Sequence, residues 1–515
     1  MTSKSIQRNI KIGIVISYAI LAIGILSHLF YTPFLLNYIG DRQYGLFSFV
    51  ISITSWFNIV TYALNDSFVK ISSDYEKKNG NNKTTNTIYL KLLIILSVLV
   101  CCVAATIFVC MKTGIIPLNN YSSLEKNIIF IIFIISSSTI AASTIMTFFR
   151  LFVEYNEKFI FARSISLGQS LTVMALSIIS ILLGANVVVI AAIQCFGGLM
   201  TLIIYSLYSR FKLKISFART TLKQEKPLVK TIVTFSSFLL LSTIVGEVNS
   251  AADKVLLGFF AMPEYVALYE LAFVFPTMFA SLSTSINAVF ISRLNKLNAA
   301  GEKEAVKSLF LRISKLQRSI LMLVLGGFLV CGKEFVCLWV GSERISVFYI
   351  AITLLLIDSY TFSSYSSFVI ERANFKHKIP CILEFCSAFL NILITVILLV
   401  VSPKEQAITN CLIGTAIAKI LFKWIIIPEY DRKALKLPIN RIRFEYLRQL
   451  IMSIVLVFAI NRIIEITINT SSLPILYTFL IKGSSYFVIY VAIILVMEDE
   501  YRVSLKSNLK KLFKR

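Results

Sequence analysis

The chain has 515 residues, of which 57% are hydrophobic and only 15% are charged. Its mean hydropathy of +0.80 and its low charged fraction exclude an ordinary soluble protein, in which about 25% of residues are charged. The formal net charge of +24 could indicate nucleic-acid binding. However, the basic residues lie in short segments between apolar blocks, which favours a membrane protein with a basic inner face.

The apolar blocks are roughly twenty residues long, the length that crosses a bilayer as a helix. We therefore predict an all-α polytopic membrane protein with fourteen transmembrane helices. In chain order the predicted spans are 12–36, 45–66, 92–111, 127–149, 164–184, 186–208, 231–257, 265–290, 319–339, 347–370, 379–401, 406–427, 449–468 and 475–497. The first block is too long for a signal-peptide core, so it is expected to stay as a span.

The distribution of Lys and Arg predicts the orientation. With the N-terminus in the cytoplasm, the inner segments hold 40 of these residues and the outer loops hold 6. This bias predicts a multi-pass protein of the bacterial inner membrane with both termini in the cytoplasm. The loops between spans are too short for a folded soluble domain, which excludes a fused ATPase or an outer enzyme module.

An internal repeat at an offset of 221 residues predicts two halves. Leu35 corresponds to Leu256, and Tyr44 to Tyr265. An even number of spans separates the copies, so the halves are parallel, an arrangement typical of transporters. We predict an N-terminal lobe at 1–209, a cytoplasmic linker at 210–230, a C-terminal lobe at 231–428, and two appended spans with a basic cytoplasmic tail at 429–515.

Five stretches in chain order carry a resemblance to a known family. They are IGDRQYGLFSF (39–49), FFRLFVEYNEKF (148–159), DKVLLGFFAMPEYVALYELAF (253–273), LNKLNAAGEKEAV (294–306) and WVGSE (339–343). Together they resemble the polysaccharide (O-antigen and capsule) flippases of the multidrug/oligosaccharidyl-lipid/polysaccharide exporter superfamily.

The resemblance implies two lobes that open alternately to the two sides of the membrane. It implies a flippase that carries an undecaprenyl-diphosphate-linked oligosaccharide from the inner to the outer leaflet, for lipopolysaccharide or capsule synthesis. The implied partners are this lipid-linked substrate, membrane lipids and a polysaccharide polymerase. Neither a cofactor nor a metal is expected, and the protein is not expected to be an enzyme.

Charged residues inside apolar blocks are the candidate site residues, because such charges usually face a hydrated path or a partner. A diphosphate needs cations, and Lys254, Lys419 and Arg150 are the candidates. Glu384 could pair with Lys419 from the adjacent span, whereas Lys423 is expected to reach the inner surface by snorkelling. The remaining candidate cavity residues are Glu247 and Asp253.

Asp358, near the middle of a predicted span, and His28 are candidates for binding a coupling cation or proton. For each of these charged residues a purely structural role, as a capped, snorkelling or hydrogen-bonded group, stays open. Arg462 and Lys482, in the two appended spans, are expected to form structural pairs.

Two other functions stay open as alternatives. A cation-coupled antiporter of the multidrug-extrusion type would need a more acidic or aromatic path. A membrane polysaccharide polymerase would need a long outer loop that carries catalytic residues. Cysteines do not suggest a disulfide framework or a metal site, because the nine present lie in or beside apolar blocks and form no CxxC pair.

Overall fold

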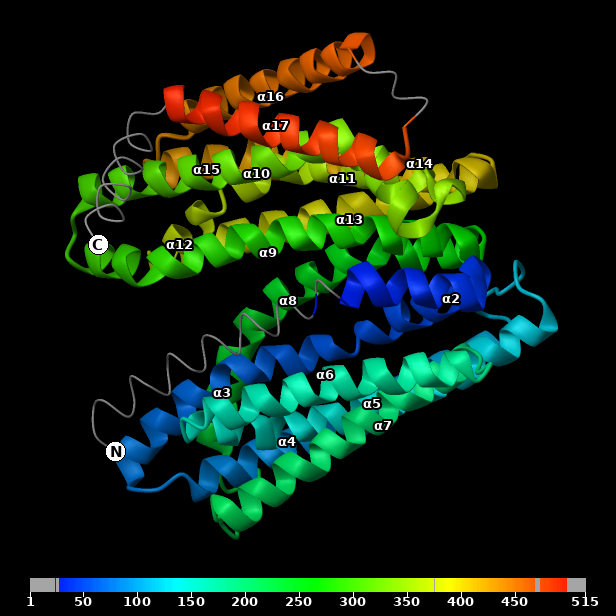
Figure 1. Cartoon of the computed structure of the whole chain (residues 1–515). Helices are drawn as coiled ribbons and strands as arrows, with labels where there is room; N and C mark the ends of the chain where they lie inside the picture. Colours follow the sequence, from blue (N-terminus) through cyan, green and yellow to red (C-terminus); the bar gives the residue numbers. More distant parts are fainter. Residues whose placement is uncertain (1–23, 25–26, 375, 468–472, 498–515) are drawn as a thin grey trace, which may run out of the picture. The chain divides into compact units, whose positions relative to one another are not determined.

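The computed structural model describes residues 24, 27–374, 376–467 and 473–497 (Figure 1). Within these residues the chain forms helices and no strand, which confirms the predicted all-α class. The α-helices are α2 (Thr32–Ser55), α3 (Asn58–Asn79), α4 (Lys83–Lys112), α5 (Ser123–Tyr155), α6 (Phe159–Leu182), α7 (Val187–Leu207), α8 (Lys226–Phe260), α9 (Pro263–Ala299), α10 (Lys303–Val340), α11 (Ser346–Ser363), α12 (Ser366–Ala373), α13 (Lys378–Val401), α14 (Ala407–Lys419), α15 (Ile427–Ala434), α16 (Ile439–Thr467) and α17 (Ile475–Met497).

Eleven of the described helices are long and apolar enough to cross a membrane. The predicted count of fourteen spans is therefore not confirmed, although most predicted blocks coincide with helices. The first predicted span, 12–36, lies largely outside the described residues. Within the predicted outer loop at 37–44, Gly40 has non-helical backbone angles (φ 78°, ψ 161°), so the helical segments on its two sides, both counted in α2, meet at a kink.

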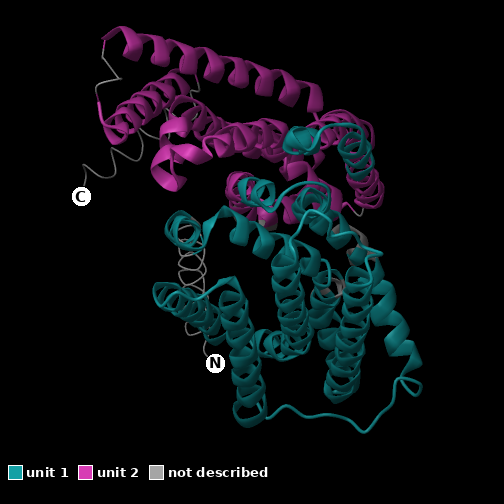
Figure 2. Cartoon of the chain, turned by 90° about the vertical axis from the view of Figure 1, so that its right-hand side faces the viewer, with its two compact units in different colours: residues 1–270, 392–411 teal, residues 271–391, 412–515 magenta. Residues whose placement is uncertain are grey.

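The described chain divides into two compact units, coloured separately in Figure 2. The first unit comprises 1–270 and 392–411, and the second comprises 271–391 and 412–515. The boundary therefore falls within α9, and α8 belongs to the first unit. The predicted lobes, 1–209 and 231–428, describe sequence repeats and stay a prediction.

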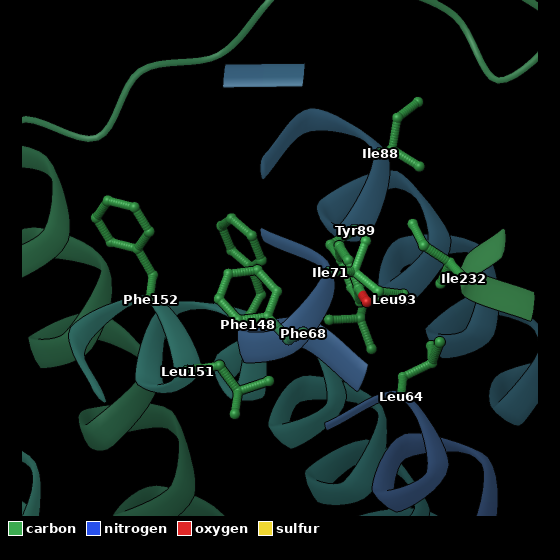
Figure 3. Packing of buried hydrophobic residues seen from close by; sticks show 10 residues of the cluster. All are labelled: Leu64, Phe68, Ile71, Ile88, Tyr89, Leu93, Phe148, Leu151, Phe152 and Ile232. Atoms are coloured by element: carbon green, nitrogen blue, oxygen red, sulfur yellow. The ribbon is translucent and has the colours of Figure 1, made fainter. Parts of the chain in front are cut away.

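The core of the first unit is an aromatic and aliphatic cluster on α3, α4, α5 and α8, shown in Figure 3. Phe68 is fully buried at its centre, with its ring 4.9 Å from that of Tyr89 and 5.9 Å from that of Phe148. The Tyr89 hydroxyl lies 2.8 Å from the hydroxyl of Ser67. The Ser236 hydroxyl of α8 also donates to Ser67, at 3.1 Å. Four helices are thus held by apolar burial with the polar atoms satisfied.

In the second unit, α17 is fastened to α10 by two buried tyrosines. Tyr486 and Tyr490 donate from their hydroxyls to the backbone oxygens of Met322 and Ser319, at 3.1 and 3.0 Å. Gly326 makes the close approach possible, because a Cβ at this position would lie 1.8 Å from the Tyr486 hydroxyl oxygen. Beside them, Lys482 forms an ion pair of 2.6 Å with Glu334, which confirms the structural pairing expected for this lysine.

Candidate functional site

An ion pair inside the second unit joins two of the predicted site residues. Asp358 of α11 and Lys419, the last residue of α14, lie 2.8 Å apart (Oδ1 to Nζ). Their side chains are 9% and 13% exposed. A lone charge at this depth would be costly, so each residue satisfies the other. The pairing explains how both charges are tolerated in apolar helices and places Asp358 directly beside a cation.

The chain beyond Lys419 changes its winding. Residues Ile420–Ile426 form a π-helical segment, a form that is often found at functional positions. Within it, the indole N–H of Trp424 donates to the backbone oxygen of Ile357 at 2.9 Å. This bond fixes the segment against α11 at the residue before Asp358. The distance between the Asp358 carboxylate and Lys419 is therefore set by a helix-to-helix anchor as well as by charge.

A second ion pair lies beside the first. Glu384 of α13 is in direct contact with Lys423, and the side chains are 20% and 14% exposed. The structure thus corrects the expected pairing of Glu384 with Lys419, because Asp358 already occupies that lysine. It also corrects the snorkelling role of Lys423, whose ammonium has a carboxylate partner on the neighbouring helix.

Two further carboxyl groups lie together in the second unit, and the sequence analysis did not single them out. Glu371 of α12 and Asp431 of α15 are 2% and 1% exposed. Burial, followed by the nearby Asp431 carboxyl, raises the pKa of Glu371 well above its usual range. Glu371 therefore keeps its proton at neutral pH and can donate a hydrogen bond. One feature of the sequence could have indicated this group: Glu371 directly follows the predicted span 347–370.

In the first unit, consecutive residues of α8 take partners on consecutive residues of α9. The Tyr269 hydroxyl donates to Asp253 Oδ2 at 2.5 Å, and Lys254 Nζ lies 2.6 Å from Glu270 Oε2. Asp253 is buried, and the Lys254 side chain is 12% exposed. The two charges of α8 are thus directed to different partners, as expected for adjacent helix positions. Glu270 lies inside the predicted span 265–290 and meets the same criterion as the other candidates, but it was not among the predicted site residues.

The remaining predicted site residues are Arg150, Glu247 and His28. Arg150 pairs along α5 with Glu154, at 3.4 Å. Glu247 is a half-buried residue of α8. His28 lies in the π-helical segment Ser27–Tyr31, and its side chain is outside the described part of the chain. The roles of these residues stay predictions. Among the described residues, no group of three or more His, Cys, Asp or Glu could hold a metal ion.

A basic residue in the first resemblance stretch gathers two carboxylates in the first unit. Arg42 contacts Glu125 at the start of α5 and lies 3.0 Å from Glu264 in the first turn of α9 (Nη1 to Oε1). The Arg42 side chain is 48% exposed, so each pair contributes little alone, but the two fix one position. The sequence predicts Arg42 in an outer loop, but it does not predict the ion pairs with Glu125 and Glu264.

The same region leaves no room for side chains at two glycines. A Cβ on Gly45 would lie 1.9 Å from the backbone oxygen of Pro263. A Cβ on Gly258 would lie 1.9 Å from the Phe49 ring. The Tyr121 hydroxyl donates to the backbone oxygen of Gly258. In the first unit, α2 thus lies directly against the end of α8 and the start of α9, which carry Lys254, Glu264 and Glu270.

Comparisons with known proteins agree with this architecture. The family described as "Polysaccharide biosynthesis protein" matches residues 10–297, more than half of the chain. Among curated protein sequences none matches significantly.

Several solved structures have the same fold. The structure titled "Lipid II flippase MurJ, inward closed conformation" has a TM-score of 0.71 and 15% identity, over 94% of this chain and 99% of that one. An inward-facing multidrug resistance MATE family transporter of the MOP superfamily has a TM-score of 0.64 and 13% identity, over 80% of this chain and 95% of that one. At such identities the likeness concerns the fold alone.

The match over 10–297 and the shared all-helical fold confirm the resemblance drawn from the five sequence stretches, at the level of the family. The chain therefore belongs to the family of polysaccharide biosynthesis proteins, with the fold of the MOP-superfamily transporters.

Proposed function

We propose that this protein is a flippase of the bacterial inner membrane. Its substrate is an undecaprenyl-diphosphate-linked oligosaccharide, moved from the inner to the outer leaflet for the synthesis of a surface polysaccharide such as O-antigen or capsule. The protein acts as a transporter and forms no covalent intermediate. The observation that carries the proposal is the polysaccharide-biosynthesis match over 10–297, in a chain with the fold of a lipid II flippase.

The buried ion pairs support a diphosphate-binding role. Lys419 and Lys254 each lie in an apolar helix, and in the described part of the chain each pairs with a carboxylate, that of Asp358 and that of Glu270 respectively. A diphosphate, like a carboxylate, has negatively charged oxygens, and it has more of them. It can therefore replace the carboxylate as the partner of the lysine ammonium. Release of the diphosphate then lets the carboxylate return. The lysine is never left as an isolated charge in the hydrocarbon region.

Asp358 has a second role in this scheme. When the diphosphate takes Lys419, the Asp358 carboxylate loses its cation and becomes costly unless it binds a proton or another cation. Substrate binding and cation uptake are thereby coupled at one residue. This role deepens the ion-coupling prediction for Asp358 without requiring a dedicated metal site.

The proposal is tested in proteoliposomes that contain the purified full chain. A fluorescent polyprenyl-diphosphate disaccharide is placed in both leaflets, and a membrane-impermeant reductant then bleaches the outer pool. Active protein is expected to expose the inner pool to bleaching, and empty liposomes are the control. Absence of flipping, together with uptake of a cationic dye, would favour the multidrug antiporter instead.

A further inference from the structure

A guanidinium of α16 contacts the π-helical segment that follows Lys419 in the second unit. Arg443 donates from Nη2 to the backbone oxygens of Trp424 and Ile425, at 2.9 and 3.2 Å. Both oxygens belong to the π-helical segment Ile420–Ile426. The helix that contains the first of the two predicted appended spans therefore contacts the candidate site directly.

The sequence explains why the first of these oxygens needs an outside donor. In a regular α-helix the backbone oxygen of Trp424 would accept from the amide of the residue four positions later. That residue is Pro428, which has no N–H, and a proline within a helical stretch kinks it. A backbone oxygen without a donor costs about as much free energy as a lost hydrogen bond. Arg443 supplies the missing donor, and its charge strengthens the bond.

A second side chain of α16 contacts the helix that carries the carboxylate of the ion pair. The Tyr446 hydroxyl lies 2.5 Å from that of Ser359, the residue after Asp358 on α11. Tyr446 is 1% exposed, and its ring lies 5.7 Å from that of Trp424. Because Arg443 and Tyr446 are three residues apart, they lie on the same face of α16. This face therefore contacts both α11 and the segment directly after the lysine of the ion pair.

The contacts of Trp424 connect the two sides. Its backbone oxygen accepts from Arg443, and its indole N–H donates to the backbone oxygen of Ile357 at 2.9 Å. Ile357 and Ser359 are the two sequence neighbours of Asp358. The lysine of the ion pair directly precedes the π-helical segment, so the winding of this segment determines where its ammonium lies. One guanidinium thus stabilises the winding on which the geometry of the pair depends.

We propose that Arg443 is a positioning residue for the Asp358–Lys419 ion pair. Its guanidinium holds the π-helical winding after Lys419, and this winding sets where the ammonium meets the carboxylate or the diphosphate. The inference rests on the proposed function, in which Lys419 exchanges Asp358 for the substrate. It makes α16 part of the transport site, whereas the sequence predicts only an appended span.

The position of Trp424 is measured first, by fluorescence and independently of transport. The chain has three tryptophans, so the full chain with the substitutions W56F/W339F reports Trp424 alone. In this background R443Q is expected to shift the emission to longer wavelength, because the indole leaves the backbone oxygen of α11 and becomes more hydrated.

Two further variants serve as controls. R443K keeps a charged donor and should restore part of the emission shift and part of the transport. R462Q removes another arginine of α16, whose guanidinium lies 3.2 Å from Glu465 and pairs along the same helix. It should leave both the emission and transport unchanged.

Transport is measured next, as the concentration dependence of flipping in proteoliposomes. R443Q is expected to raise KM about tenfold, which is the loss expected when one charge-assisted hydrogen bond is out of place. The maximal rate should fall less than this. A merely structural role would lower the amount of folded protein, and hence the maximal rate, without changing KM.

Three outcomes would overturn the proposal. They are an unchanged emission in R443Q, equal losses in R443Q and R462Q, and a lower maximal rate of R443Q at an unchanged KM. The variant D358N/K419Q shows which inference has failed. If it flips the substrate at the natural rate, the proposed exchange at Lys419 is wrong. If it is inactive while R443Q keeps the natural KM, the role of Arg443 is wrong.

Discussion

Replacing Asp358 by asparagine tests whether the buried ion pair serves transport or only the fold. The substitution keeps the shape of the side chain and removes its charge. Lys419 then keeps its position, 13% exposed, without the carboxylate that lies 2.8 Å away in the structure. The amide oxygen of asparagine can still accept a hydrogen bond, so the main loss is electrostatic.

The size of the effect follows from the geometry. At 2.8 Å and an effective dielectric constant of about 20, the attraction between the two charges is about 6 kcal/mol. The cost of burying both ions offsets most of this attraction, so the pair itself contributes little net stability. Removing one partner leaves an uncompensated charge, and we expect Asp358→Asn to lower the free energy of unfolding by about 3–5 kcal/mol.

The double variant D358N/K419Q separates the two roles. With both charges removed, stability should return close to that of the natural chain, because no unpaired ion remains. Transport should not return, because the diphosphate has lost its cation and the coupling carboxylate is gone. Stability is read from thermal unfolding in detergent, and transport from the proteoliposome assay or from restoration of surface polysaccharide in a flippase-deficient strain.

The reasoning is refuted if D358N/K419Q transports at the natural rate. The pair would then be structural only, and the proposed exchange of carboxylate for diphosphate at Lys419 would be wrong. A single D358N variant with unchanged stability and transport would also refute the expected loss of about 3–5 kcal/mol, because it would mean that Lys419 loses no net interaction.

Three other predictions concern packing, protonation and orientation. Gly45→Ala should destabilise the first unit by more than about 1 kcal/mol, because its Cβ would lie 1.9 Å from the Pro263 oxygen, whereas Gly168→Ala, with open space around it, should be neutral or slightly stabilising in thermal unfolding. Stability should fall as pH rises above the ordinary pKa of a glutamate, because the raised pKa of folded Glu371 keeps a proton that the unfolded chain releases, and Glu371→Gln should flatten this part of the profile. A cysteine at exposed Ser342, in a variant without native cysteines, should react with an impermeant reagent in intact cells; reaction only after the membrane is breached would reverse the predicted orientation.

The sequence predicted the helices well because bilayer length and hydropathy are local properties. Most predicted spans, such as 475–497, coincide with helices. It placed a turn at 37–44, and non-helical backbone angles at Gly40 kink α2 within this segment. It did not predict that the span expected at 347–370 is divided into α11 and α12. Interruptions of a helix depend on neighbouring helices, which hydropathy does not report.

The candidate site was predicted as a set of charges with one expected pair, Glu384 with Lys419, which the structure corrects. Asp358, Lys419, Glu384 and Lys254 were all identified, because an ionisable residue in an apolar block is rare and costly. Their partners were not predicted correctly, because which side chains meet depends on how the helices pack, which hydropathy does not report. The pairing of Asp358 with Lys419 joins residues 61 positions apart.

The pair between Lys254 and Glu270 gives the last prediction, which concerns release of the substrate. If the lysine exchanges a carboxylate for the diphosphate, the carboxylate competes with the substrate. Glu270→Gln should then strengthen substrate binding, because Lys254 no longer has to leave a charged partner 2.6 Å away. The Lys254 side chain is 12% exposed and that of Glu270 is 28% exposed, so the carboxylate is the better hydrated of the two groups. Turnover should fall, because release of the diphosphate no longer returns the lysine to a carboxylate.

We therefore expect a lower KM together with a lower maximal rate for Glu270→Gln, and a higher KM for Lys254→Gln, both measured as the concentration dependence of flipping. Lys254→Arg, which keeps the charge, should retain part of the activity. A higher KM for Glu270→Gln would show that Glu270 holds Lys254 in place for the substrate, and the competition between carboxylate and diphosphate would be wrong for this pair.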